Sequence, residues 1–343
     1  MRKVCIAVNI CTYKREESLR HILRKLQNSL FFDGNTESVY GGGLYLFITD
    51  NAGEMEEMQS RHIRLKHNPR GNTGGSGGYQ YGIERMRSSG IEFTHVVFMD
   101  DDVDFEPDCF YRLFDFLLNA RGEDLERPIA GRMLRTDQPD VQYTAAEIWN
   151  GGQIRHVGFN KKLCEIASEP EAEFHAGADY GGWWFSCYPW SFVRENDIMP
   201  FFLHCDDVEY GLRCGRPPII LKGVQVWHEV FEHRLTPLTV YYDTRNALYI
   251  NDKYGLEPDS ERVLADWKAK ISAYHVRREW EYEYYAIRGM YDFLRGTEWL
   301  YRIHPGKYHQ KLQKARISRY RNSVLWRAAE YQFRRKYGER EKA

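Results

Sequence analysis

Short apolar runs alternate with amphipathic segments through the first third of the chain. The runs have the length of buried strands and lie at residues 4–10, 43–50, 62–68 and 95–100. Between the first two runs, one face of a predicted helix carries Leu19, Ile22, Leu23 and Leu26. Strands that alternate with helices predict an α/β fold with a mainly parallel, doubly wound sheet. Ligands of such sheets bind at the carboxyl ends of the strands.

Polar side chains follow several of these predicted strands. Asp50 ends the second run, Asn72 lies in a glycine-rich turn, and the last run ends in Asp100, Asp101 and Asp102. Three adjacent carboxylates repel one another, so we expect something to neutralise them. Two carboxylates separated by one residue can hold a divalent ion that also binds phosphate oxygens. An isolated triplet would favour a solvated acidic turn, but its position after an apolar strand favours a metal–phosphate site.

The glycine-rich stretch GNTGGSGG is weak evidence by itself. No GK[ST] follows it, and it is not a GxGxxG directly after the first strand, so the common nucleotide fingerprints fail. It reads equally well as a flexible turn before a helix. Backbone N–H groups of Gly74 and Gly75 at that helix start could still bind a ribose or a phosphate.

Residues 177–233 contain a second group of candidates. Asp206 and Asp207 open a helical pattern, where carboxylates take part in chemistry or simply cap the helix. Trp183 and Trp184 lie beside paired glycines; we expect one ring in the core, and an exposed ring would form a platform for a sugar. His228 follows the strand-like VQVW, and a lone His is more often structural than a ligand.

Composition describes an ordinary globular protein. The 343 residues are 43% hydrophobic and 28% charged, enough for one large domain or two unequal ones. Seven cysteines without a CxxC pair predict reduced, cytosolic thiols. No uninterrupted apolar stretch approaches the ~18 residues of a spanning helix, and the N-terminus lacks the core of a signal peptide. We therefore expect a cytoplasmic chain that is not exported.

Charge is concentrated at the C-terminus. Residues 301–343 hold 13 Lys and Arg against 3 Asp and Glu, in a chain of net charge −1. Apolar residues between the charges favour helices over a disordered arm, and we predict a helical region at 256–343 after a main domain at 1–255. Its basic tail could be a solvated, packed helix or could attach to the inner face of an anionic membrane. Nucleic acid is the least favoured partner.

Eight short motifs occur in order along the chain: CTYKR, TDNAG, NTGGSGG, FMDDD, GGWWF, DDVEYGLR, WH and YYDTRN. Together they resemble family 2 inverting glycosyltransferases of GT-A fold, and most of all the galactofuranosyltransferases that polymerise bacterial cell-wall galactan. The resemblance covers residues 1–250. It implies a Rossmann-like, mainly parallel sheet flanked by helices. It also implies transfer of a sugar from a nucleotide donor, with UDP-galactofuranose as the best match, to a glycan or lipid-linked glycan.

The resemblance also implies roles for single residues. Asp100 and Asp102 would bind Mn²⁺ or Mg²⁺ on the donor diphosphate, with His228 completing the metal site. Asp207 would be the general base, and displacement by one carboxylate-activated hydroxyl needs no covalent intermediate. The acceptor would contact Asp206, Trp183 and Trp184. The residues implied to face the uridine diphosphate are Arg15, Asp50, Asn72, Gly74, Gly75, Asp100 and Asp101.

Several alternatives stay open. Galactan polymerases of this kind have a domain before the GT-A core, whereas the first strand here begins at Val4. This difference favours single addition to a capsular or surface-polysaccharide intermediate over processive polymerisation. A rhamnosyltransferase or another GT-A enzyme would share almost every motif. A nucleotidyltransferase would not explain the WW and DDxEY segments, and a non-catalytic carbohydrate-binding protein would show no turnover.

Overall fold

The computed structural model describes residues 3–32, 35–231, 235–256 and 259–340. The chain divides into two compact units. The first comprises Met1–Trp149, Ile154–Met199 and Asp206–His233, and the second Asn150–Gln153, Pro200–Cys205 and Arg234–Ala343. Each unit is described by itself.

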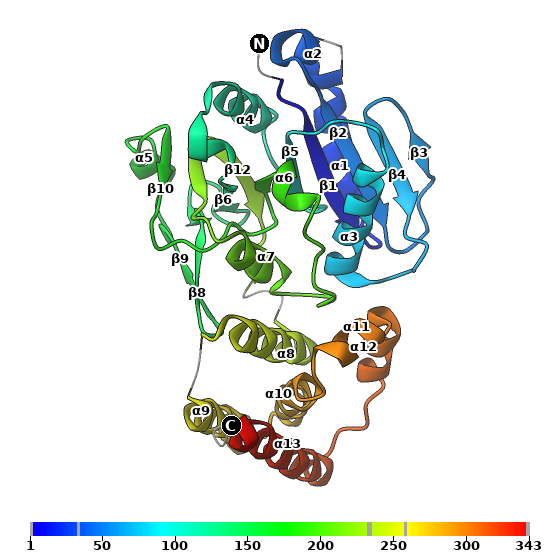
Figure 1. The fold of residues 1–343 in the computed structure, drawn as a ribbon, viewed down its shortest axis with the longest axis vertical. Helices are drawn as coiled ribbons and strands as arrows, with labels where there is room; N and C mark the ends of the chain where they lie inside the picture. Colours follow the sequence, from blue (N-terminus) through cyan, green and yellow to red (C-terminus); the bar gives the residue numbers. More distant parts are fainter. Residues whose placement is uncertain (1–2, 33–34, 232–234, 257–258, 341–343) are drawn as a thin grey trace. The chain divides into compact units, whose positions relative to one another are not determined.

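The first unit is built on a mixed, mostly parallel sheet (Figure 1). Its N-terminal half confirms the four predicted strands, which run parallel to one another: β1 (Ile6–Thr12), β2 (Leu44–Asp50), β4 (Ile63–His67) and β5 (His95–Asp100). The two-residue β3 (Met58–Gln59) pairs antiparallel with β4 at the edge. Because these parallel strands all run the same way, Asp50 and Asp100 end at the same edge of the sheet.

The other half of the sheet mixes directions. The strand β11 (Ser186–Pro189) runs antiparallel between β5 and β6, whereas β12 lies parallel to β6. The sheet order is β10-β12-β6-β11-β5-β1-β2-β4-β3, with β7 paired to β6 and a separate β8–β9 pair. The remaining strands are β6 (Ile129–Arg135), β7 (Gln142–Thr144), β8 (Glu147–Asn150), β9 (Gln153–His156), β10 (Ala172–Phe174) and β12 (Ile219–His228).

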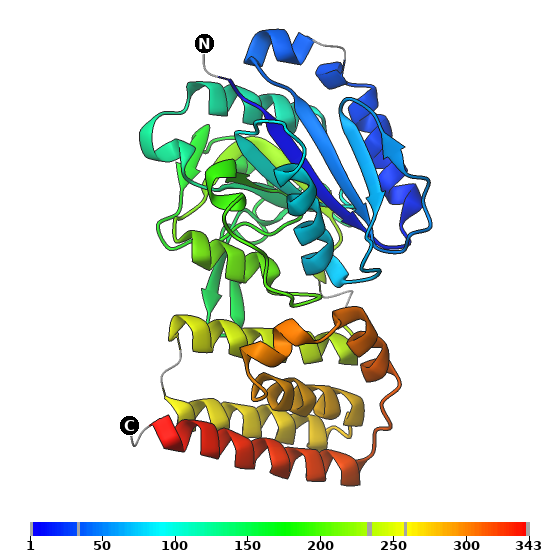
Figure 2. The ribbon, with the colours of Figure 1, turned by 45° about the vertical axis from the view of Figure 1, so that its right-hand side comes forward.

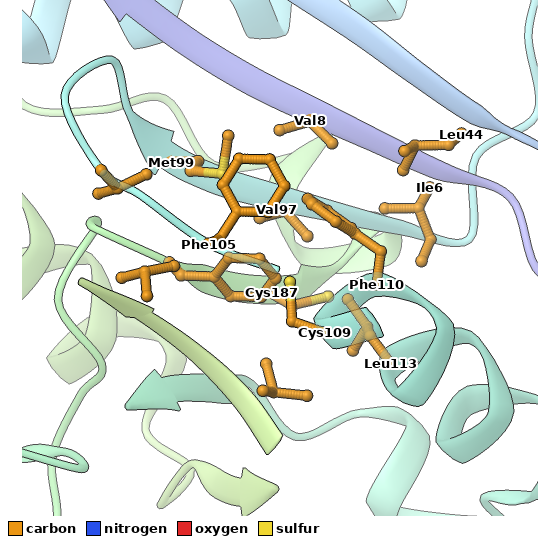
Figure 3. Close-up of a cluster of buried hydrophobic side chains, with 14 of the residues drawn as sticks. Ile6, Val8, Leu44, Val97, Met99, Phe105, Cys109, Phe110, Leu113 and Cys187 are labelled. Atoms are coloured by element: carbon orange, nitrogen blue, oxygen red, sulfur yellow. The ribbon is translucent and has the colours of Figure 1, made fainter. Parts of the chain in front are cut away.

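Helices cover both faces of this sheet. Successive residues of β5 alternate between two cores: Val97 and Met99 face one, and Val96 and Phe98 the other. Figure 3 shows part of the first core, where side chains of β1 and β5 meet α4. The predicted apolar face of α1 is buried, as expected. The helices of this unit are α1 (Glu16–Gln27), α2 (Asn35–Tyr40), α3 (Gly74–Arg87), α4 (Asp108–Asn119), α5 (Leu163–Ile166), α6 (Trp190–Val193) and α7 (Asp206–Cys214), with 3₁₀ turns at Leu30–Phe32 and Gly122–Leu125.

The glycine-rich stretch lies inside α3 from Gly74 on, and only its first three residues precede the helix. A Cβ at Gly78 would lie 2.1 Å from Cys11 Sγ, and one at Gly82 would lie 2.0 Å from Asn9 Oδ1. These glycines therefore let α3 pack closely on β1. Helix propensity disfavours glycine, but the close backbone approach decides at these positions.

The second unit consists mainly of helices (Figure 2). Its core is formed where α8 packs along α10, and α13 lies against α10 and α9. Thr236 caps the start of α8, and Gly255 ends it in the left-handed conformation. A helical C-terminal region is thus confirmed: α8 (Pro237–Tyr254), α9 (Ser260–Val276), α10 (Trp280–Phe293), α11 (Thr297–Arg302), α12 (Pro305–Gln313) and α13 (Arg319–Arg340).

The compact units separate before α8, whereas the domain boundary expected at residue 255 follows this helix. The difference has a physical reason, because the buried residues of α8 pack against α10. Within the described part of the chain, no helix combines the length and the apolar character needed to cross a membrane. All seven cysteines are free thiols: Cys5, Cys11, Cys109, Cys164, Cys187, Cys205 and Cys214.

Candidate active site

Asp100, Asp102 and His228 come together at the carboxyl edge of the sheet. One ligand atom from each lies within 4.8 Å of the others. His228 Nε2 is 3.3 Å from Asp102 Oδ1 and 3.7 Å from Asp100 Oδ2. Two backbone hydrogen bonds, Asp104 N to Trp227 O and Trp227 N to Asp104 O, bring the end of β12 beside the aspartates. The three residues that the sequence suggested for a metal site therefore lie close together.

The position and orientation of the His228 ring fit a metal ligand. Its ring is fully buried, and Nδ1 lies 2.7 Å from the Glu229 carbonyl oxygen, to which it donates. Nε2 faces the two carboxylates, and it has no hydrogen-bond partner among the described residues. A buried polar nitrogen without a hydrogen-bond partner is unfavourable, and a cation between it and the carboxylate oxygens would satisfy it. A backbone carbonyl that orients the second nitrogen is also usual for metal-bound histidine.

Arg15 neutralises part of the aspartate triplet. Its Nη1 lies 2.9 Å from Asp101 Oδ1 and 2.8 Å from Asp102 Oδ2. Burial raises the pKa of Asp101, and the Arg15 charge opposes this rise. Burial and the neighbouring Asp102 carboxylate raise the pKa of Asp100 to about 7. One guanidinium therefore does not balance three carboxylates, and the edge favours a further cation.

Two residues of α3 hold the acidic groups in place, and sequence reasoning missed both. The Tyr79 hydroxyl donates to Asp100 Oδ1 at 2.9 Å, and the Ser76 hydroxyl donates to Asp206 Oδ2 at 2.9 Å. Ser76 and Tyr79 are three residues apart, so they lie on the same face of the helix. The glycine-rich helix thus connects the end of β5 with the start of α7. An amphipathic pattern starting at Gly74 was the available signal, but the glycines concealed it.

Asp207 lies in the first turn of α7, half-buried. Its Oδ1 accepts a hydrogen bond from Val208 N at 2.8 Å. Burial, then the neighbouring Asp206 and Glu147 carboxylates, raise the pKa of Asp207 well above its usual value. Once ionised, a carboxylate with a raised pKa is a better proton acceptor than an ordinary one. Asp207 thus fits both alternatives that the sequence left open, a residue at a helix start and a general base.

Both indole rings are buried, where the sequence predicted one ring in the core and left an exposed ring as a possible sugar platform. Trp183 and Trp184 are 4% and 3% exposed. Trp183 stacks on Phe98 with ring centroids 4.5 Å apart, and Trp184 Nε1 donates to Gly131 O at 2.8 Å. Both rings belong to the two cores of the sheet, because each has an apolar layer to fill. Neither ring offers a free face for a sugar.

Asp50 and Asn72, which were expected at the nucleotide, both accept hydrogen bonds from nearby backbone N–H groups. Asp50 is buried, and its carboxylate accepts hydrogen bonds from the backbone N–H groups of Ala52, Glu54 and Met55. Its interactions shape the loop after β2. Asn72 Oδ1 accepts from Gly74 N at 2.9 Å, which fixes the start of α3.

Gly75 borders the acidic group of α7. A Cβ there would lie 3.9 Å from Asp206 Oδ2. The nucleotide roles of Asp50, Asn72, Gly74 and Gly75 remain predictions, as do those of Arg15 and Asp101.

The YYDTRN motif lies in the second unit and supports the segment that precedes α7 in the chain. Arg245 and Asn246 are buried on α8. Arg245 Nη2 donates to Phe201 O at 2.5 Å, and Asn246 Nδ2 donates to Leu203 O and His204 O at 2.8 Å each. This segment includes three non-glycine residues at positive φ, which is unfavourable without such support: Phe202, His204 and Cys205.

Comparisons with known proteins agree with the motif order. Residues 7–163 match the model of Glycosyl transferase family 2. A curated relative, galactofuranosyltransferase GlfT2 of Mycolicibacterium smegmatis, is 29% identical over 261 residues, which are 70% of this chain and 39% of the relative. Galactofuranosyltransferase GlfT2 of Mycobacterium tuberculosis is 26% identical over 330 residues, which are 87% of this chain and 49% of the relative. The chain spans less than half the length of both relatives.

A solved structure supports the fold alone. The crystal structure of S. aureus TarS 1-349 superposes with a TM-score of 0.50 at 13% sequence identity, over 97% of this chain and 92% of that one. The GT-A fold expected from the sequence is thereby confirmed. Residues 7–163 thus match a glycosyltransferase family 2 domain, and the chain has a GT-A fold followed by a helical C-terminal region.

Proposed function

We propose that this chain transfers a sugar from a nucleotide donor to a glycan, with inversion and with the help of a divalent ion. The observation that carries the proposal is the buried His228 Nε2, which faces the carboxylates of Asp100 and Asp102. Two carboxylate oxygens and one imidazole nitrogen suit Mn²⁺, and Mg²⁺ less well because it prefers oxygen. Family 2 membership of residues 7–163 supports the same chemistry.

The acidic edge, formed by Asp100, Asp101 and Asp102 at the end of β5, would act on the leaving group. Asp100, Asp102 and His228 would hold the ion, whose positive charge stabilises the departing nucleoside diphosphate. Arg15 keeps Asp101 and Asp102 oriented and adds a second positive charge beside them. Tyr79 fixes the rotamer of Asp100 through its hydroxyl. A ligand set held by packing and hydrogen bonds avoids reorganisation during the reaction.

The start of α7 would act on the acceptor. Asp207 takes the proton of the acceptor hydroxyl, which attacks the anomeric carbon from the side opposite the leaving diphosphate. Such a single displacement inverts the anomeric configuration. Asp206, held by Ser76, would accept hydrogen bonds from other acceptor hydroxyls. Neither step needs a covalent intermediate with the enzyme.

The donor is proposed to be UDP-galactofuranose. This choice is supported by the names of both curated relatives, at 29% and 26% identity. The acceptor would be a glycan or a lipid-linked glycan of a bacterial surface polysaccharide, extended by a single addition. The basic C-terminal helices would favour a location at the inner face of the cell membrane. Another sugar, such as rhamnose from a thymidine nucleotide, is the alternative because the same site chemistry would serve it.

Nucleotide release from a panel of donors tests this function. Purified protein is given Mn²⁺, a mixed glycolipid acceptor and each sugar nucleotide in turn, with EDTA and Asp207→Asn as controls. We expect EDTA-sensitive release of UDP from UDP-galactofuranose. Release from a thymidine donor alone would replace the sugar and keep the mechanism. Release of pyrophosphate would identify a nucleotidyltransferase, and ligand binding without turnover in any arm would identify a carbohydrate-binding protein.

A further inference from the structure

The second unit contains a hollow of about 930 Å³. Its walls come from α10, from α12 and the residues after it, and from α13. All of them belong to the second unit, so the hollow is a property of that unit alone. We call it the basic hollow, because six cationic side chains line it: Arg288, Lys307, Lys311, Lys314, Arg316 and Arg321.

Among the described residues, no acidic side chain compensates five of these six charges. Arg288 pairs with Asp292, whose Oδ1 lies 2.9 Å from its Nη2. The other five cations form no ion pair with the described residues, and no described acidic residue lines the basic hollow. Like charges gathered in a concave surface create a positive potential that attracts anions. Folding of the second unit does not explain this arrangement, because mutual repulsion of the cations opposes it.

The lining also has a polar and an apolar component. Four tyrosines contribute hydroxyl groups, and the Tyr308 hydroxyl is held between Arg288 and Asp292. Apolar contacts come from Leu312, Val324 and Leu325. At the rim, Tyr320 is 78% exposed and Val324 is 50% exposed. Exposed aromatic and aliphatic groups beside basic ones are typical of surfaces that bind amphiphilic anions.

We propose that the basic hollow binds a phosphate-bearing amphiphile, that is, a lipid phosphate. Arg316 and Arg321 can form charge-assisted hydrogen bonds with a phosphate, and the lysines add point charges. The apolar wall and the exposed rim would receive the hydrocarbon part. A nucleic acid is disfavoured because a hollow of this volume holds a compact ligand rather than an extended strand. The proposal does not depend on the sugar-transfer reaction, because it concerns a different unit and is tested by binding.

Binding of a soluble, short-chain phosphatidic acid tests the proposal directly. Calorimetry on the full chain would measure this probe beside inorganic phosphate, a short-chain phosphatidylcholine and an RNA oligonucleotide. We expect saturable binding of one phosphatidic acid per chain, at least about tenfold tighter than any of the other three probes. Sedimentation with phosphatidylcholine vesicles, with and without long-chain phosphatidic acid, separates a bilayer source of the ligand from a soluble one.

Two charge-reversal variants separate the basic hollow from general electrostatics. Lys311→Glu with Arg321→Glu changes the lining, whereas Arg319→Glu with Arg327→Glu makes the same change at exposed sites outside it. We expect the first pair to weaken phosphatidic acid binding by about 30-fold and the second by less than about threefold. All four sites are exposed, so circular dichroism and melting temperature should match the wild type. Val324→Asn should weaken phosphatidic acid binding several-fold without affecting inorganic phosphate.

Several results would overturn the proposal. Equal losses in the two charge-reversal variants would mean that overall charge, not the basic hollow, attracts the lipid. Inorganic phosphate that binds as tightly as phosphatidic acid would remove the role of the apolar wall. Tighter binding of RNA, or no binding of phosphatidic acid, would reject a lipid phosphate site.

Discussion

The acidic edge of the first unit and the basic hollow of the second present opposite electrostatic problems. Asp100, Asp101 and Asp102 are crowded at a strand end with one guanidinium nearby. The basic hollow gathers cations and offers no acidic side chain from the described residues. Both regions carry charge that the described residues of their own unit leave uncompensated. Such charge costs folding energy, so it points to ligands of opposite sign: a divalent cation in the first case and an anion in the second.

The two regions differ in how well the order of residues along the chain predicts them. The aspartate triplet is contiguous, and a parallel sheet brings the ends of its strands to one edge. The cations of the basic hollow come from α10, α12, α13 and a connecting segment, and they meet only because the helices pack in one way. A site at strand ends can therefore be found from sequence order, whereas a site between helices cannot.

The largest expected effect concerns the acidic edge. Asp102→Asn should lower sugar transfer at least about 100-fold, because it removes one ligand and leaves His228 without its closest carboxylate. Asp104→Asn is the matched control: its carboxylate pairs with Lys25 at 2.6 Å on the surface, outside the ligand group. The control should keep transfer within about threefold of the wild type. Near-normal turnover of Asp102→Asn in a folded protein would reject the metal site.

A second effect concerns the proton acceptor. Asp207→Asn should lower kcat about 100-fold or more while leaving nucleotide binding intact. Because burial raises the pKa of Asp207, the group is ionised only above that raised value. Transfer by the wild type should therefore fall as the pH drops through a pKa higher than that of an ordinary carboxyl group. The residual activity of Asp207→Asn should not show this decrease at low pH. A pH profile of kcat/KM that is the same in both proteins would exclude Asp207 as the base.

A smaller effect concerns stability without ligand. Asp100→Asn removes one of three crowded carboxylates, so the metal-free variant should be more stable than the wild type by roughly 1 kcal/mol. Mn²⁺ should raise the melting temperature of the wild type and leave that of Asp100→Asn almost unchanged. Thermal melts with EDTA and with Mn²⁺ measure both. A wild type that Mn²⁺ fails to stabilise would indicate that Arg15 alone neutralises the edge.

Sequence reasoning found the parts of the fold and site that depend on local patterns. Apolar periodicity gave the strands β1, β2, β4 and β5, and motif order grouped Asp100, Asp102 and His228. Packing decided the rest. The sequence could not predict that Tyr79 orients Asp100, because that contact requires α3 to begin within a glycine run. It also could not separate buried from exposed indole rings, since Trp183 fills a core through contacts with Phe98.

The smallest expected effects concern one aromatic ring in each unit. Trp184 is buried in the first unit and donates a hydrogen bond to Gly131 O, whereas Tyr320 is exposed at the rim of the basic hollow. Trp184→Phe should therefore lower the free energy of unfolding by about 1–2 kcal/mol through the lost hydrogen bond and volume. Its KM for the acceptor should not change. Tyr320→Ser should leave the free energy of unfolding unchanged and weaken phosphatidic acid binding. Denaturant unfolding and acceptor kinetics of Trp184→Phe test the first prediction. A raised KM for the acceptor with an unchanged free energy of unfolding would show that Trp184 contacts the acceptor.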